Sequence, residues 1–183
     1  MSFAAVQRIL GLLLTVFSFT LVPPFVLALV VQDGAATAFV SAFALTLSVG
    51  LISWLPVRSV RRELRLRDGF VVVVMFWTVL STIGALPFIL ADDPRLSITD
   101  AMFESISGLT TTGATVITHL EGLPKSILYY RQQLQWLGGM GIIVLAVAVL
   151  PMLGIGGMQL YLSLIHISEP TRLDLASRMP SSA

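Results

Sequence analysis

Residues 97–117 read SITDAMFESISGLTTTGATVI, and this segment fits neither a membrane-spanning helix nor an ordinary loop. Ser97 or Thr99 can cap the start of a helix, and Asp100 suits the positive end of the helix dipole. The apolar residues that follow predict two or three helical turns, which we expect Gly108 to end. Residues 109–117 are rich in Thr and have poor helix propensity. The segment therefore predicts half a membrane span followed by an extended loop.

The composition of the whole chain places this segment in a membrane protein. Of the 183 residues, 56% are hydrophobic and 11% are charged, whereas a soluble domain is usually about 25% charged. The formal net charge of +1 gives no reason to expect a nucleic-acid partner. The chain has no cysteine, which excludes disulfides and thiolate metal sites.

Three uncharged runs are long enough to cross the roughly 30 Å of hydrocarbon in a bilayer. They are residues 9–31, 35–57 and 69–91, and a fourth run gives a membrane portion at residues 134–153. The first run far exceeds the apolar core of a signal peptide, so we read it as an uncleaved span. The pair Pro23-Pro24 should kink or interrupt that span, and Asp92-Asp93-Pro94 should end the third.

The orientation follows from a basic cluster between the second and third runs. Five of the eleven basic residues lie there: Arg58, Arg61, Arg62, Arg65 and Arg67. The positive-inside rule makes this loop cytoplasmic, and the N-terminus then is cytoplasmic as well. Contact with anionic lipid or a partner protein is the alternative reading of the cluster.

The third run then ends outside and the fourth begins outside, so the segment between them must enter and leave on one face. Irregular backbone at membrane depth is tolerated only where it is buried in protein or lines a water-filled path. An extended Thr/Gly stretch can direct the carbonyls of Thr111, Thr112 and Gly113 at a monovalent cation, and Gly113 can adopt the positive φ that this requires. The alternative is an outer β-turn. Glu104 either hydrogen-bonds the amides of the loop, which we favour, or contacts the ion directly.

Several strings resemble a known family. Residues 103–115 closely resemble the first pore loop of the Trk/Ktr/HKT cation transporter superfamily, and the bacterial potassium uptake subunits of that superfamily most of all. Residues 135–144 and 150–154 resemble the second membrane helix of the same repeat, and residues 156–161 resemble its exit. The resemblance covers residues 1–161.

The resemblance implies an all-α integral membrane fold of four transmembrane helices plus one re-entrant pore helix and filter loop. Residues 1–57 would be two leading transmembrane helices and residues 58–68 a basic cytoplasmic loop. Residues 69–161 would form the first of four helix, pore-loop, helix repeats around one pore. Residues 162–183 complete the chain as a tail.

The resemblance also implies site residues. The filter carbonyls would come from Thr110, Thr111, Thr112 and Gly113, with potassium at the last three and Thr110 at the inner edge. Glu104, Ser107 and Gly108 would support the filter. Glycine at position 113 resembles the potassium-selective members, whereas sodium-preferring plant relatives have serine there.

The implied function is potassium uptake across the bacterial cytoplasmic (inner) membrane by a multi-pass protein. Members of the family are homodimeric and usually pair with a cytosolic nucleotide-binding regulatory subunit. Potassium is the substrate, and no cofactor is expected. Conduction as a channel and coupling to protons are both compatible with the resemblance, and the gating residues would lie in later repeats.

The chain departs from the family in two respects. It contains one repeat rather than four, so we expect it not to conduct by itself. Residues 163–172 resemble translated sequencing-adaptor read-through, so residues 162–183 are expected not to be native protein. The alternative for them is a natural, disordered cytoplasmic tail.

Two other functions compete with ion uptake. A membrane anchor that binds other helices and conducts nothing would also use the glycine clusters, but it has no need of irregular backbone at membrane depth. An intramembrane enzyme is not expected, because the chain has no H-E-x-x-H or G-x-S-x-G motif and both His119 and His166 stand alone.

Overall fold

The computed structural model describes residues 3–59 and 66–152, and of residues 66–68 and 144–152 it describes the backbone only. The chain divides into two compact units, residues 1–141 and 142–183. In the second unit, the described residues 142–152 continue the last helix of the first.

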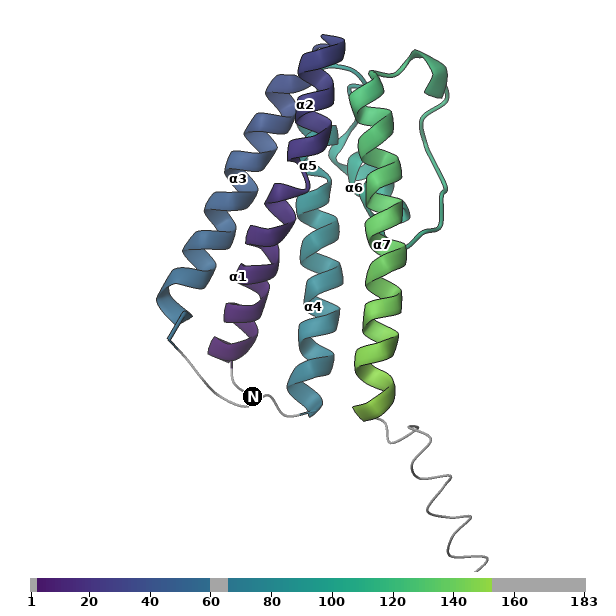
Figure 1. Ribbon diagram of the computed structural model, residues 1–183. Coiled ribbons are helices and arrows are strands. Elements are labelled where there is room, and N and C mark those ends of the chain that lie inside the picture. The colour runs from purple at the N-terminus through teal and green to yellow at the C-terminus, as the bar shows by residue number, and fades with distance from the viewer. Residues whose placement is uncertain (1–2, 60–65, 153–183) are drawn as a thin grey trace, which may run out of the picture. The chain divides into compact units, whose positions relative to one another are not determined.

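The described residues are all helical apart from turns and loops (Figure 1). The elements are α1 (Phe3–Phe19), α2 (Val22–Val31), α3 (Ala36–Trp54), the short 3₁₀ helix η1 (Leu55–Val57), α4 (Leu66–Gly84), α5 (Leu86–Leu90), α6 (Ile98–Leu109), the 3₁₀ helix η2 (Leu120–Gly122) and α7 (Lys125–Met152).

Three segments of the described part are long and apolar enough to cross a membrane. They are Phe3–Val31, Ala36–Val57 and Gly69–Leu90, so the structure has helices where the first three spans are predicted. The fourth predicted run lies in α7, and its role as a span stays a prediction.

The first span is interrupted where the sequence predicted it. The helix breaks at Thr20 and Leu21, whose amides bond back to Phe17 and Ser18 in tight turns at 2.9 and 3.0 Å. Pro23 lies in the first turn of α2, where its missing amide hydrogen costs nothing. The third span is also broken, between α4 and α5, and this break was not expected from the sequence. Pro87 lies in the first turn of α5 and plays the same part there.

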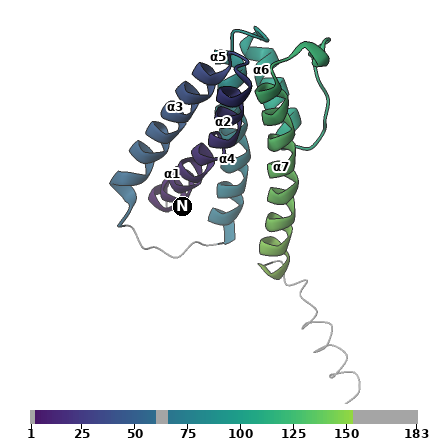
Figure 2. The ribbon, with the colours of Figure 1, turned by 45° about the horizontal axis from the view of Figure 1, so that its top comes forward.

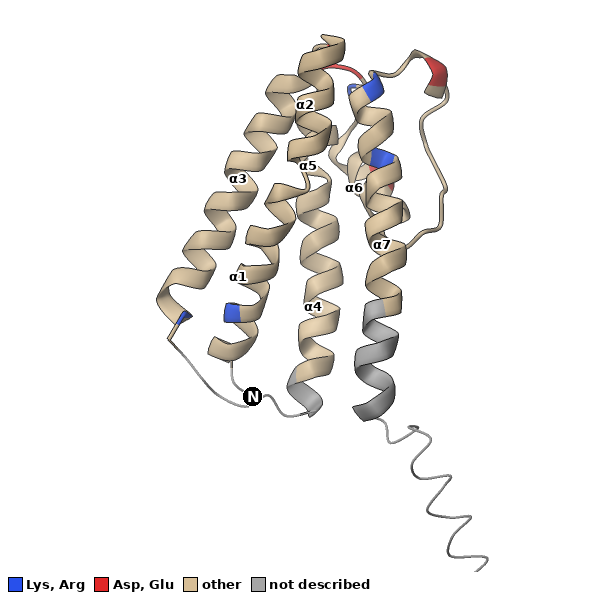
Figure 3. Ribbon diagram, viewed as in Figure 1, with Lys and Arg blue, Asp and Glu red and all other residues tan. Residues whose placement is uncertain are grey.

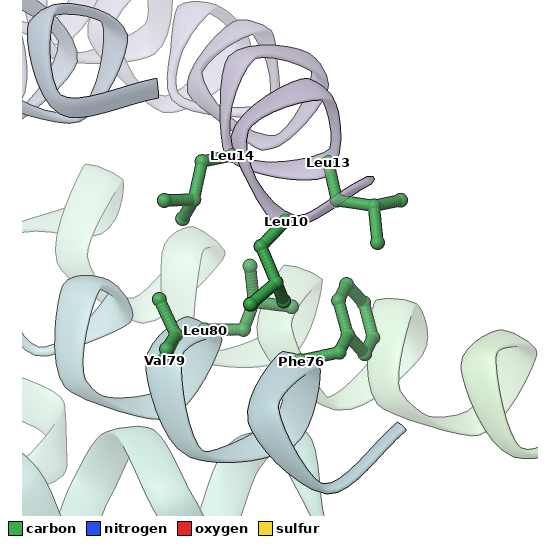
Figure 4. A pocket seen from close by; sticks show the side chains of 6 residues that line it. All are labelled: Leu10, Leu13, Leu14, Phe76, Val79 and Leu80. Atoms are coloured by element: carbon green, nitrogen blue, oxygen red, sulfur yellow. The ribbon is translucent and has the colours of Figure 1, made fainter. Parts of the chain in front are cut away.

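The charged residues of the described part lie near the ends of the long helices and beside α6 (Figure 3). Arg8 lies in the second turn of α1, and Arg58 directly follows η1 after the end of α3. Arg61, Arg62 and Arg65 fall outside the described residues. Between these ends, α1 and α4 meet along an apolar seam (Figure 4), which is lined by Leu10, Leu13, Leu14, Phe76, Val79 and Leu80.

An aromatic cluster ties the beginning of α7 to α3 and α5. The rings of Phe39 and Phe88 lie with their centroids 5.6 and 5.3 Å from that of Tyr130. All three side chains are buried, and the Tyr130 hydroxyl donates to the Gly84 carbonyl at 2.9 Å. A buried hydroxyl needs such a partner, so the bond also fixes how α7 lies against the end of α4.

The helix α6 follows α7 for only part of its described length. It begins at the end of the bundle where α2, α5 and the start of α7 lie, and the loop after it returns to that same end (Figures 1 and 2). Its last residue, Leu109, packs against Gly138. Gly138 lies roughly 20 Å along α7 from Lys125 at 1.5 Å per residue. The loop after α6 therefore starts part-way along α7 rather than at the end where α7 begins.

Candidate functional site

The helix α6 starts with the capping chemistry that the sequence predicted. The Ser97 hydroxyl accepts a hydrogen bond from the Asp100 amide at 3.2 Å and donates one to the Asp100 carboxylate at 2.8 Å. Ser97, rather than Thr99, is thus the N-cap, and Asp100 lies in the first turn. The bond from the Asp100 amide satisfies one of the amides that a helix start leaves unpaired.

The expectation that Gly108 ends the helix is wrong, because α6 runs through Gly108 to Leu109. A Cβ on Gly108 would lie 3.1 Å from the Cβ of Leu134. The glycine therefore serves close packing of α6 on α7, and the helix ends one residue later. The Thr110 amide closes it with a bond to the Ile106 carbonyl at 2.8 Å.

Ser107 holds the first turn of the loop. Its carbonyl accepts hydrogen bonds from the amides of Thr112 at 3.0 Å and Gly113 at 3.4 Å. Its hydroxyl donates to the Ala114 carbonyl at 2.7 Å. One buried serine thus fixes the loop at three successive residues.

Two residues of this turn have a positive φ. Gly113 has a φ of 74°, which is the conformation that the sequence predicted for it. Thr111 has a φ of 58°, which was not expected, since a β-branched residue rarely adopts that conformation. The Thr111 hydroxyl donates to the Thr110 carbonyl, and the hydroxyls of Thr110 and Thr112 lie 2.8 Å apart. These bonds within the turn help to hold the unusual backbone.

Glu104 joins three segments of the chain. Its side chain is fully buried, and one oxygen accepts hydrogen bonds from the Thr115 hydroxyl at 2.6 Å and the Val116 amide at 2.9 Å. The other oxygen forms an ion pair with Arg131 Nε at 2.7 Å. The loop, α6 and α7 are thereby held to one carboxylate.

Arg131 is a site residue that the sequence did not predict. In the sequence it stands out only as the residue before the fourth uncharged run. The available signal was a basic residue close to an apolar run, with the buried candidate Glu104 in need of a counter-charge.

One face of α7 lies behind the loop. A Cβ on Gly138 would overlap the Leu109 carbonyl, and one on Gly139 would lie 3.8 Å from the Thr111 methyl group. A Cβ on Gly113 would lie 3.1 Å from Gln135 Nε2. Residues of α6 and the loop thus lie against successive turns of α7, beginning at Arg131.

Three carbonyl oxygens of the loop have no hydrogen-bond partner in the part of the chain that the structure describes. Residues 110–116 are exposed. Within the described part of the chain, the carbonyl oxygens of Thr111, Thr112 and Gly113 accept no hydrogen bond, although the amides of the same residues are bonded inside the turn. Three consecutive free acceptors on a fixed backbone can coordinate a hard cation.

The described residues contain no group of three His, Asp or Glu side chains that could hold a metal ion. His119 is exposed and lies next to η2, and His166 is outside the described residues.

Comparison with known proteins gives consistent matches. The model of the TrkH family, described as cation transport protein, matches residues 35–175. The chain is 60% identical over 161 residues to the Trk system potassium uptake protein TrkH of Vibrio parahaemolyticus, covering 88% of this chain and 33% of that protein. It is 44% identical over 158 residues to the Trk system potassium uptake protein TrkG of Escherichia coli, covering 86% of this chain and 33% of that protein.

A solved structure is similar over the same region. The crystal structure of the potassium transporter TrkH from Vibrio parahaemolyticus aligns with a TM-score of 0.81 and 55% sequence identity, covering 91% of this chain and 37% of that one. The chain thus spans about a third of the length of the curated relatives it matches.

Proposed function

The chain belongs to the TrkH family of cation transport proteins, and we propose that it supplies the N-terminal third of a subunit that takes up potassium. The two leading helices and the first helix, pore-loop, helix repeat would be the part that this chain contains. The complete subunit would place four such repeats around one pore.

The observation that carries this proposal is the row of free carbonyls at Thr111, Thr112 and Gly113. A filter of carbonyl oxygens replaces the hydration shell of the ion. At membrane depth, irregular backbone is tolerated only where it is buried in protein or lines a water-filled path, which suits free carbonyls that face an ion pathway. One loop supplies one side of such a ring, and the other sides would come from the later repeats.

The residues around the row suit supporting roles. Ser107 and Glu104 bond the loop from behind, and Gly108 lets α6 approach α7 closely. The carbonyl of Thr110 accepts the Thr111 hydroxyl, which suits a place at the inner edge rather than in the ring. Potassium would then lie against Thr111, Thr112 and Gly113.

The proposed topology is four transmembrane helices with α6 as a re-entrant half-helix. At 1.5 Å per residue, the 12 residues of α6 reach roughly 18 Å, little more than half of a hydrocarbon layer about 30 Å thick. The start of α7 at the same end as α6 supports a re-entrant path (Figure 1). The helix α7 would be the fourth span.

The surroundings follow from the same proposal. The subunit would lie in the bacterial inner membrane with its N-terminus and its arginine-rich loop in the cytoplasm. It would form a homodimer and pair with a cytosolic nucleotide-binding regulatory subunit. These partners rest on the family resemblance alone.

A non-conducting membrane anchor is the competing function, and a growth test separates the two. The complete polypeptide that contains this sequence should restore growth of a bacterium deficient in potassium uptake when potassium is scarce. The 183-residue chain expressed alone should not. Rescue by the chain alone would contradict its role as one part of a pore. Failure of the complete polypeptide, with its presence in the membrane verified, would contradict the transport function.

We also propose that residues 162–183 are not native protein, and this proposal has its own test. These residues lie outside the described part of the chain. The nucleotide sequence beyond the codon for Tyr161, read from an independent clone, should continue into three further repeats. An unchanged sequence would show that the tail is native.

A further inference from the structure

Gln135, on the face of α7 that lies against the loop, has no evident structural role. Gln135 lies one helical turn after Arg131, on the side of α7 that faces the loop, and its side chain is half-buried. Among the described residues it makes no hydrogen bond. The two preceding glutamines differ from it, because Gln133 donates to the Thr20 carbonyl at 2.7 Å and Gln132 is exposed.

The carboxamide of Gln135 occupies the space behind Gly113. A Cβ at position 113 would lie 3.1 Å from Gln135 Nε2, closer than nine in ten real Cβ contacts, and no other atom of the described part comes within 4 Å once the adjoining residues are set aside. Among the described residues, this one side chain therefore decides whether position 113 has room for a side-chain carbon. The positive φ of 74° is a separate constraint, intrinsic to the backbone.

We propose that Gln135 is a specificity-determining residue of the cation filter, acting as the wall against which Gly113 rests. This inference rests on the proposed function. With the wall in place, the backbone of Gly113 cannot withdraw from the pore, and its carbonyl stays at the distance that suits potassium. Without it, the loop can relax toward α7, and the spacing of the carbonyls then no longer discriminates between potassium and the smaller sodium ion.

The role is one of filling space, and three variants of the complete polypeptide test it. Gln135→Ala removes the wall, Gln135→Met keeps its volume without the amide, and Gln132→Ala is the matched exposed control. The readout is the uptake of rubidium, as a potassium substitute, relative to sodium in cells that lack other potassium uptake. Gln135→Ala should lower this ratio about threefold or more, within the range for residues in direct contact. Gln135→Met and Gln132→Ala should keep the ratio of the parent.

A double variant tests for a rescue of uptake that a general packing role would not produce. Gly113→Ala should impair rubidium uptake, both through its positive φ and through the contact with Gln135. Adding Gln135→Ala to Gly113→Ala should restore uptake about threefold, because it makes room for the methyl group. A double variant no better than Gly113→Ala alone would overturn the proposal.

The remaining outcomes are also decisive. The amount of each variant in the membrane is measured alongside, and if Gln135→Ala does not accumulate, the shorter Gln135→Asn should show a smaller loss of the ratio. An unchanged ratio in a well-expressed Gln135→Ala or Gln135→Asn would overturn the proposal, as would a loss in Gln135→Met equal to that in Gln135→Ala. All of these comparisons require a parent protein that takes up rubidium. If the parent takes up none, the proposed function is contradicted, and so is this inference.

Discussion

Arg131 Nε lies 2.7 Å from Glu104 Oε2, and the same carboxylate holds the Thr115 hydroxyl and the Val116 amide. The Glu104 side chain is 0% exposed and that of Arg131 is 13% exposed. A buried ion pair of this kind adds little net stability compared with an apolar pair, but it is costly to break from one side. It joins α7 to the loop through α6, so a change at either residue should reach the loop.

Glu104→Gln should destabilise the protein by about 3 kcal/mol, because it leaves Arg131 partly buried without a counter-charge. Thermal unfolding of the purified protein in detergent measures this. Glu121→Gln is the matched control, since Glu121 is exposed in η2 and should change the midpoint little. Equal midpoints for the two variants would contradict a structural role of the pair.

Gly138→Ala and Gly139→Ala should behave differently although the two glycines are neighbours. A methyl group at 138 would overlap the Leu109 carbonyl, whereas one at 139 would make an ordinary contact of 3.8 Å with Thr111. Gly138→Ala should cost about 1–3 kcal/mol, or more if α6 must move. Gly139→Ala should be neutral or slightly stabilising, because alanine favours a helix over glycine. Comparable unfolding midpoints would show that α6 does not lie against α7 as described.

Asp33 should make stability depend on pH only in acid. Burial alone would raise the pKa of Asp33, but hydrogen bonds from the amides of Ser126 at 2.9 Å and Ala35 at 3.2 Å outweigh it, so its pKa lies below 3.8. A lowered pKa in the folded state means that the charge stabilises the fold above pH 3.8 and that this stabilisation is lost as the pH falls through the folded value.

The matching experiment compares the parent with Asp33→Asn. The variant should unfold at a lower temperature than the parent at about pH 7, and the difference should shrink below about pH 3.8. Asp92→Asn, at an exposed site, is the control. A difference that grew in acid would have the wrong sign for a carboxylate that is stabilised by amides.

Tyr130→Phe should cost about 1–2 kcal/mol, since it removes the only hydroxyl that the structure shows donating to the Gly84 carbonyl. Tyr129→Phe removes a hydroxyl from the neighbouring side chain, which is 44% exposed, and should have almost no effect. The two variants have identical chemistry, so chemical denaturation compares the sites directly. A loss in Tyr129→Phe as large as that in Tyr130→Phe would contradict the role given to the buried bond.

Several features could be predicted because their cause is local. The uncharged runs give the three candidate spans by length and composition alone. Ser97 caps α6 through a bond to a residue three positions on, and Pro23 interrupts the first span through its own ring. Gly113 takes a positive φ that glycine adopts without strain.

The features that could not be predicted depend on distant segments. Glu104 and Arg131 are 27 positions apart, and the sequence near either residue does not indicate that the two pair. Gly108 would end a free helix, but close packing on Leu134 lets the helix continue through it. Thr111 takes a conformation against its own preference, because bonds from Ser107 and within the turn hold the neighbouring residues.

The most direct test of the filter assignment is the ratio of sodium to potassium permeability of the complete polypeptide with Gly113→Ser. A serine there must adopt a φ of 74° and meet Gln135, so its carbonyl cannot stay where that of the glycine lies. We predict that the ratio rises roughly tenfold, equivalent to about 1.4 kcal/mol of lost discrimination. An unchanged ratio in a variant that accumulates and transports like the parent would contradict the assignment of Gly113 to the filter.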